Sequence, residues 1–265
     1  MNIQELKDLQ PLVYQQFVTI LEQGRLAHAY LFSGDFASFE MALFLSQALF
    51  CQEKVGVHPC GKCRSCRLIE SNDFSDVTIV APQGNFIKTD TIRELVKNFS
   101  QSGFESSQQV FIIRDAEKMH VNAANSLLKV IEEPQSTIHI FLLTNQEEAV
   151  LPTIKSRTQI ISFPQNLPYL ERFLEEEGLL KTQASLIARL VSSQEEAKRL
   201  ATNKSFIDLL DQAKKFTELL LTDSNRAYLQ VGVLVSLAVE KAEQGRLFDV
   251  LSLLLAERLT EMIAR

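Results

Sequence analysis

The chain has 265 residues, 46% of them hydrophobic and 23% charged, which is typical of globular proteins and long enough for more than one domain. Its 27 Lys and Arg residues are outnumbered by 33 Asp and Glu residues, which argues against a protein that wraps nucleic acid by itself, because phosphate binding needs clustered basic side chains. No apolar run reaches 18 residues, and no basic segment followed by an apolar one opens the chain, so we expect a cytoplasmic protein without a membrane partner.

The first predicted elements are a helix, a strand and a second helix. Pro11 stands in the first turn of a helix that ends near Gly24. Residues 29–32 predict a buried strand, and residues 35–49 have the length and spacing of a helix. A strand that leads into a helix through a glycine is the place where nucleotide-binding folds hold phosphate.

The loop after this strand departs from the phosphate-binding pattern. Such a loop needs several glycines, a Lys for the phosphates and a Ser or Thr for the magnesium ion. Here Gly34 is the only glycine, and Glu40 and Met41 occupy the positions of the Lys and the Ser or Thr. No lysine occurs between Lys7 and Lys54, and an acid would repel a triphosphate. We therefore expect a degenerate phosphate loop and no ATP bound by this chain.

Four cysteines lie within sixteen residues in the spacing C-x8-C-x2-C-x2-C: Cys51, Cys60, Cys63 and Cys66. In a cytosolic chain this clustering indicates metal rather than disulfides. Four thiolates suit a tetrahedral zinc with no open position, so we expect structural zinc. An iron–sulfur cluster is the alternative, although the fourth cysteine and following proline of ferredoxins are absent downstream. His58 is either a substitute ligand or a surface residue.

The next elements predict an alternation of strands and helices. A strand at 77–80 precedes a helix from about residue 89, in which Thr91 and Glu94 have capping-box spacing and which Gly103 ends. Residues 110–163 then continue with a strand, a helix closed by proline, and two further strands. This alternation predicts a doubly wound parallel sheet, whose chemistry collects at the carboxyl ends of the strands.

Three clusters of polar residues lie at or near the ends of these strands. Arg114-Asp115 stands where an active ATPase has an Asp-Glu pair for magnesium and water, with Glu117 displaced, and we interpret all three as a solvated strand end. Thr144-Asn145 would contact a γ-phosphate in an active relative and predicts a turn here. The third polar segment, residues 155–158, contains Arg157.

Beyond residue 165 the strand signals stop and the spacing of apolar residues is helical throughout. We place a domain boundary near residues 164–168, which gives an α/β domain followed by an all-α remainder. Residues 251–255 are apolar nearly all round, so their helix is either buried in a core or packed on a partner.

Together these stretches resemble the delta-prime subunits of the bacterial DNA polymerase III clamp loader, members of the AAA+ superfamily. The matching stretches are residues 28–34, the cysteine module after the first helix, residues 124–129 running on to Glu132-Glu133-Pro134, and Ser156-Arg157. Each piece is shared with the ATP-hydrolysing subunits of the same machine, but the degenerate phosphate loop separates this chain from them.

The resemblance implies an AAA+ ATPase-like domain at 1–165 with a zinc module at about 51–66, a small helical lid domain at 166–204, and a helical collar domain at 205–265 that is short for its role. It implies a hetero-pentamer with ATP-hydrolysing subunits and a delta subunit, which opens the sliding clamp and places it on primer-template DNA. The chain would have no ATPase or polymerase activity of its own within the DNA-directed DNA polymerase (nucleotidyltransferase) holoenzyme.

The resemblance also implies that Arg157 acts in trans as an arginine finger on ATP in a neighbouring subunit. The family's Ser-Arg-Cys stands here as Ser156-Arg157-Thr158, and without the resemblance a surface salt bridge is favoured for the arginine. Two other functions are open: an active AAA+ ATPase, which the absent lysine opposes, and a zinc-containing DNA-binding protein. The latter is supported by the basic residues Lys62, Arg64 and Arg67 and opposed by the acidic net charge.

Overall fold

The computed structural model describes residues 3–99, 106–134 and 137–263 of the chain, which divides into two compact units, Met1–Gln165 and Asn166–Arg265. The first unit contains all the strands that the described residues form, and the second contains only helices. The finer division of the second unit at residue 204 stays a prediction.

The first unit is built on a five-stranded sheet with the order β2-β3-β4-β1-β5. All its pairings are parallel, so the predicted doubly wound sheet is confirmed. Strands β1, β3 and β4 are almost continuously apolar because parallel strands are covered on both faces. The strands are β1 Ala29–Ser33, β2 Val77–Val80, β3 Gln108–Ile113, β4 Thr137–Thr144 and β5 Gln159–Ser162.

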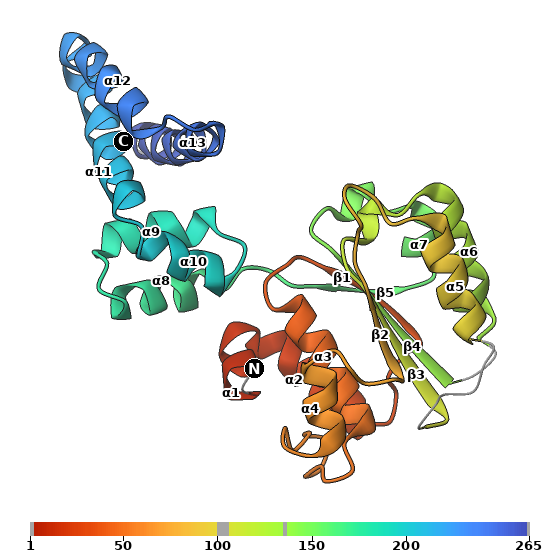
Figure 1. Cartoon of the computed structure of the whole chain (residues 1–265). Helices are drawn as coiled ribbons and strands as arrows, with labels where there is room; N and C mark the ends of the chain where they lie inside the picture. The colour runs from red at the N-terminus through yellow and green to blue at the C-terminus, as the bar shows by residue number, and fades with distance from the viewer. Residues whose placement is uncertain (1–2, 100–105, 135–136, 264–265) are drawn as a thin grey trace. The chain divides into compact units, whose positions relative to one another are not determined.

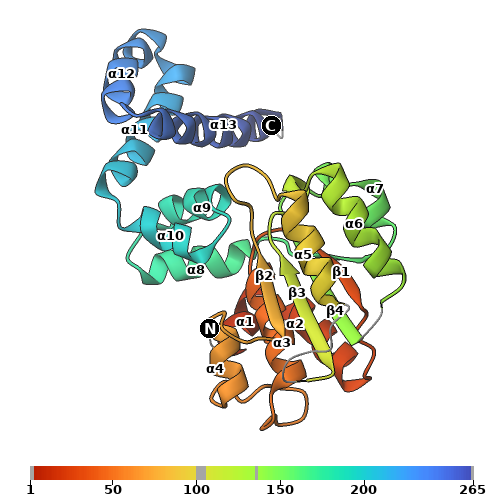
Figure 2. The same cartoon turned by 45° about the vertical axis from the view of Figure 1, so that its right-hand side comes forward.

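Helices cover the two faces of the sheet (Figures 1 and 2). On one face lie α1 Ile3–Leu9, α2 Pro11–Glu22, α3 Ser38–Phe50 and α4 Arg64–Glu70; on the other lie α5 Thr89–Phe99, α6 Val121–Glu132 and α7 Pro152–Lys155. Short 3-10 turns, η1 Ala116–Lys118 and η2 Glu147–Ala149, follow β3 and β4.

The two faces have different cores. On the α2 face aromatic rings pack together, with Phe32 at the centre: its ring centroid lies 5.6 Å from that of Phe17, 5.5 Å from that of Phe141 and 4.7 Å from that of Phe163. The opposite core is mainly aliphatic, with Phe111 among side chains such as Leu31, Ile92, Leu127 and Ile140.

Three local predictions differ from the structure. Helix α1 was not expected, and α3 begins at Ser38 rather than near residue 35 because Ala37 has a left-handed backbone with φ 61°. The capping-box prediction is wrong, because α5 begins at Thr89 and Thr91 therefore lies inside the helix. The chain just before the helix is held by a backbone hydrogen bond of 3.0 Å from Ile87 N to Lys118 O. Gly103 lies outside the described residues.

The second unit consists of helices, and side-chain oxygens of Asn166, Ser193, Asn203 and Asp223 cap the first turns of four of them. The helices are α8 Leu167–Glu176, α9 Lys181–Leu190, α10 Gln194–Ala201, α11 Lys204–Thr222, α12 Ser224–Leu237 and α13 Lys241–Ile263. The sequence did not predict α10, because only Ala197 and Leu200 are buried in this short, polar helix.

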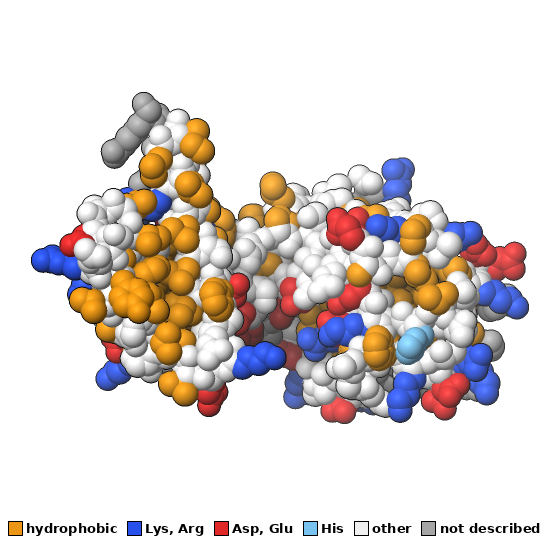
Figure 3. All heavy atoms as spheres, turned by 90° about the horizontal axis from the view of Figure 1, so that it is seen from above, with side chains coloured by type: hydrophobic (Ala, Val, Ile, Leu, Met, Phe, Trp, Pro, Cys, Tyr) orange, Lys and Arg blue, Asp and Glu red, His pale blue; other side chains and the backbone are white. Residues whose placement is uncertain are grey.

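Apolar side chains gather on the exposed surface of this helical unit (Figure 3). They come from α11, α12, α13 and the link between the last two: Leu220, Leu221, Tyr228, Leu229, Val231, Val233, Val235, Val239, Phe248 and Leu259. Residues 251–255 are partly covered instead, with Leu254 buried. Across the described residues we find no helix with the length and apolar character needed to cross a membrane.

Candidate functional site

The loop between β1 and α3, predicted from the sequence to be a degenerate phosphate loop, is held by contacts within the chain. The side chain of Phe36 is only 2% exposed. The backbone carbonyl oxygen of Phe36 accepts a hydrogen bond of 2.8 Å from Gln10 Nε2, which also donates to the backbone oxygen of Pro164 at 2.7 Å. Gln10 is itself buried, so this amide ties α2, the loop and the end of the sheet together. No sequence pattern indicates this role of Gln10, because its partners lie 26 and 154 residues away.

Gly34 is required by the packing of the sheet. Its N–H donates to Thr144 O at 2.8 Å, and its φ of 112° is one that L side chains rarely adopt. A Cβ atom at this position would lie 2.3 Å from Phe163 O, which is closer than any real contact. The single glycine of the loop therefore lets the end of β5 pass close to β1.

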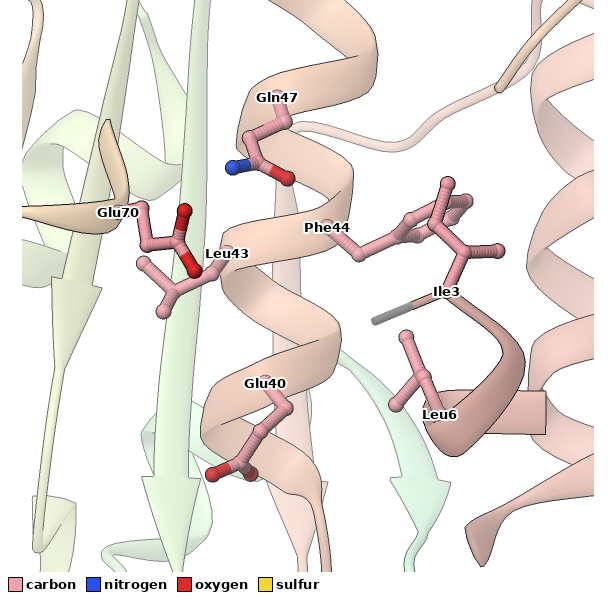
Figure 4. A pocket seen from close by; sticks show the side chains of 7 residues that line it. All are labelled: Ile3, Leu6, Glu40, Leu43, Phe44, Gln47 and Glu70. Carbon is pink, nitrogen blue, oxygen red and sulfur yellow. The ribbon is translucent and has the colours of Figure 1, made fainter. Parts of the chain in front are cut away.

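Neither Glu40 nor Met41 offers the group that a nucleotide would need. Met41 has no exposed surface and belongs to the core under α3. Glu40 lies beside a cavity between α1, α3 and α4 (Figure 4). The cavity has a volume of about 30 Å³, room for about one water and far below the ~300–1,000 Å³ of ligand pockets. Ile3, Leu6, Leu43, Phe44, Gln47 and Glu70 also line it.

The polar residues after β1 and β3 meet at the carboxyl edge of the sheet, as the topology requires. Asp35 is exposed, yet desolvation by the surrounding protein and repulsion from Asp115 raise the pKa of its carboxyl, while Arg114 opposes this rise. The Arg114 guanidinium lies 4.7 Å from the ring centroid of Phe39, and Asp115 pairs with Lys118 at 3.5 Å. The charges here thus have partners within their own domain.

Glu117 and Thr144 are joined by a hydrogen bond. Thr144 Oγ1 donates to Glu117 Oε2 at 2.7 Å and accepts from Gln146 N at 3.1 Å. Thr144 is buried, so its hydroxyl fixes the chain where β4 ends and connects it to η1.

The four predicted metal-binding cysteines come together in space. The Sγ atoms of Cys51, Cys60, Cys63 and Cys66 all lie within 4.8 Å of one another, and those of Cys51 and Cys63 are 3.9 Å apart. A tetrahedral ion with metal–sulfur bonds of about 2.3 Å needs sulfurs about 3.8 Å apart. The arrangement fits four-coordinate metal binding, so this cluster could hold a metal ion.

Local structure positions each sulfur. Cys51 directly follows α3, and Cys63 caps α4, with its Sγ accepting from Cys66 N at 3.5 Å. Cys60 Sγ accepts from the N–H groups of Lys62 and Cys63 at 3.4 and 3.2 Å, and these donors lower the pKa of Cys60 to about 7. Burial raises the pKa of Cys51 and Cys66. A metal would therefore have to displace protons from the two buried thiols.

The other candidates near the cluster lie outside it. Among the described residues that could hold a metal, the group consists of the four cysteines without His58. The His58 ring instead lies 6.2 Å from the ring of Tyr14. Lys62, Arg64 and Arg67 are exposed at the surface of the module.

Arg157 follows the short helix α7, and its guanidinium is held by three acceptors. Nε forms an ion pair with Glu132, at the end of α6. Nη1 donates to Thr153 O at 3.1 Å and to Ser156 Oγ at 3.2 Å. The side chain is still 38% exposed. The salt bridge considered from the sequence is thus present, and Glu132 is a partner that the sequence did not single out, although it lies in the Glu-Glu-Pro segment noted above.

A parallel α/β sheet with helices on both faces, completed by an all-helical unit, is the architecture expected of an AAA+ protein. Residues 9–166 match the model of the family described as "DNA polymerase III, delta subunit". The chain belongs to the family of DNA polymerase III delta' subunits.

Individual relatives agree with this assignment. The chain is 37% identical over 227 residues to DNA polymerase III subunit delta' of Bacillus subtilis, which covers 84% of this chain and 69% of that protein. It is 30% identical over 193 residues to subunit delta' of Escherichia coli, covering 71% of this chain and 58% of that protein. With subunit gamma/tau of Mycobacterium tuberculosis it shares 33% identity over 175 residues, 62% of this chain and 30% of that protein.

A solved structure shares the fold. A DNA polymerase III gamma subunit-related protein of Thermotoga maritima superposes with a TM-score of 0.51 at 24% identity, covering 89% of this chain and 76% of that chain. At this identity the likeness bears on the fold alone.

Proposed function

We propose that this chain is a clamp-loader subunit that binds no ATP and helps to place the sliding clamp on primer-template DNA during replication. The observation that carries the proposal is the degenerate phosphate loop, which lacks the required lysine and has the side chain of Phe36 buried, in a chain that keeps an exposed arginine at position 157. Its relatives are subunits delta' and gamma/tau of DNA polymerase III, and we propose that this chain assembles with ATP-hydrolysing subunits and a delta subunit. Co-purification with those subunits tests the assembly.

The first part of the proposal is that the isolated chain neither binds nor hydrolyses ATP. Glu40 and Met41 stand where a cation and a hydroxyl are needed, and Met41 is buried in the core. Isothermal titration with ATP and magnesium should give no heat of binding. Binding of micromolar affinity would instead support the alternative of an active AAA+ ATPase.

The second part is that Arg157 acts on the ATP of a neighbouring subunit. Arginine suits this task because its planar guanidinium stays charged and pairs with phosphate oxygens. Arginine fingers contribute roughly 10³ to 10⁵ in rate at a single site. Because several ATP sites share the work of a loader, we expect a smaller loss in total turnover.

The variant Arg157→Ala in a reconstituted loader tests this role. We expect unchanged melting temperature, metal content and assembly, but slower DNA-stimulated hydrolysis and clamp loading, with Arg157→Lys restoring little. Arg189→Ala is a matched control, since Arg189 is 39% exposed and paired with Glu257, much as Arg157 is paired with Glu132. Hydrolysis and loading by Arg157→Ala at the unsubstituted rate would mean that the arginine is only a salt-bridge partner.

The remaining parts concern the cysteines and the last helices. We propose that the cysteine cluster holds a structural zinc ion, because four protein thiolates leave no coordination position for a substrate. We propose residues 166–204 as the lid and residues 205–265 as the collar that contacts other subunits. The exposed apolar side chains of α11–α13 support the collar, because monomers rarely expose large contiguous apolar patches (Figure 3).

A further inference from the structure

The contacts of the Arg157 guanidinium leave one of its nitrogens open. The group carries five N–H donors, one on Nε and two on each terminal nitrogen. Nε donates to Glu132, and Nη1 donates to both Thr153 O and Ser156 Oγ. Among the described residues, the two N–H donors of Nη2 have no acceptor, and the side chain remains 38% exposed. The guanidinium is thus held on two of its three nitrogens and open on the third.

Glu132 differs from the other two partners in its origin. Thr153 and Ser156 belong to the same short segment as Arg157, whereas Glu132 lies 25 residues earlier, in the last turn of α6. That helix is fixed to the sheet by buried side chains such as Leu127 and Ile131. The Glu132 carboxylate therefore holds the long Arg157 side chain against α6, a helix that is packed on the sheet.

We propose that Glu132 is the positioning residue for Arg157: it fixes the guanidinium so that Nη2 is the nitrogen presented to a phosphate of the neighbouring subunit's ATP. This inference rests on the proposed function of Arg157. Holding the group before the subunits meet removes the need to order a long side chain during the reaction. Ser156 contributes to the same placement, since its hydroxyl accepts from Nη1 and donates to Thr153 O at 3.1 Å.

The arrangement also explains why lysine should not replace Arg157. The ammonium group of lysine presents its three donors from one point, whereas the guanidinium reaches Glu132, Thr153 and a phosphate through separate nitrogens. A lysine held by Glu132 would have its charge drawn away from the phosphate. A lysine turned to the phosphate would lose the tether.

The test measures DNA-stimulated ATP hydrolysis in a reconstituted loader in which only the ATP site next to this subunit is competent. Glu132→Ala should lower kcat by up to about 100-fold, the loss that a misplacement of about 1 Å can cause, with little change in KM for ATP. Glu132→Gln should keep most of the rate, because its amide oxygen still accepts from Nε. Glu133→Ala is the matched control: its carboxylate is exposed and has no hydrogen bond or ion pair among the described residues.

Melting temperatures of the variants separate placement from folding, because exposed ion pairs contribute little to stability. Joining Glu132→Ala to Arg157→Ala should cause no loss beyond that of Arg157→Ala alone. An unchanged rate for Glu132→Ala, with a reduced rate for Arg157→Ala, would overturn the positioning role and leave the finger intact. Faster ATP hydrolysis by the loader with Glu132→Ala would also overturn it. So would a further loss of rate in the Arg157→Ala background as large as the loss that Glu132→Ala causes alone. If the loader with Arg157→Ala hydrolyses ATP at the unsubstituted rate, the proposed arginine-finger role is refuted instead.

Discussion

Replacing Cys63 by Ser should remove the metal and destabilise the first unit. The Sγ of Cys63 lies 3.9 Å from that of Cys51 and caps α4 by accepting from Cys66 N, so the substitution removes a ligand at the centre of the module. A serine hydroxyl stays protonated near neutral pH and is a poor zinc ligand compared with a thiolate.

The size of the effect follows from linkage. A metal that binds only the folded chain stabilises it by about 2.7 kcal/mol at a free concentration 100 times its Kd and by about 4.1 kcal/mol at 1,000 times its Kd. For a unit of about 165 residues, each kcal/mol moves the melting temperature by about 2–4 °C, so the variant should melt roughly 5–16 °C lower. Complete unfolding is not expected, because the segment keeps other packing: Ile69 of α4 is buried, and the ring of Phe74, after α4, lies 5.0 Å from that of Phe50 in α3.

The assay is thermal unfolding at several free zinc concentrations, together with metal analysis of the purified protein. The melting temperature of the unsubstituted chain should rise with zinc, whereas that of Cys63→Ser should not. His58→Ala is the control, since this neighbour lies outside the sulfur cluster and should leave one zinc per chain. A Cys63→Ser chain that keeps one tightly held metal, or a melting temperature independent of metal, would refute a structural zinc site. Visible charge-transfer absorption in the unsubstituted chain would favour an iron–sulfur cluster.

Further predictions concern the protons of the same cluster and the packing of Gly34. Because burial raises the pKa of Cys51 and Cys66, both thiols are protonated at pH 7 without metal. Cys60, with a pKa of about 7, also becomes protonated as the pH falls below 7. Metal affinity should therefore fall as the pH falls, more steeply below pH 7, in titrations against a competing chelator at pH 6, 7 and 8; a pH-independent affinity would contradict this. Gly34→Ala should destabilise the fold by about 1–3 kcal/mol in chemical denaturation, because the new Cβ meets Phe163 O in a strained backbone. Gly24→Ala, also at positive φ but with open space around it, should be milder, and equal effects would argue against the close approach.

The sequence by itself determined the parallel sheet, the family and the cysteine cluster. Continuous apolar runs such as residues 110–113 and 138–143 predict strands covered on both faces, and the structure places both as interior strands of a parallel sheet. The spacing of the four cysteines predicted a cluster that the structure brings within 4.8 Å. These features are local in sequence, because a strand or a C-x2-C turn is fixed by its own residues.

Only the tertiary structure decided how the sites are held. The amide of Gln10 closes the phosphate loop through two carbonyl groups, one of them 154 residues away. Glu132 reaches Arg157 from another helix, and the need for glycine at position 34 comes from Phe163, which directly follows β5. Apolar periodicity carries no information about such contacts, because a hydrogen bond or close approach between distant segments depends on how the packed elements are placed in space.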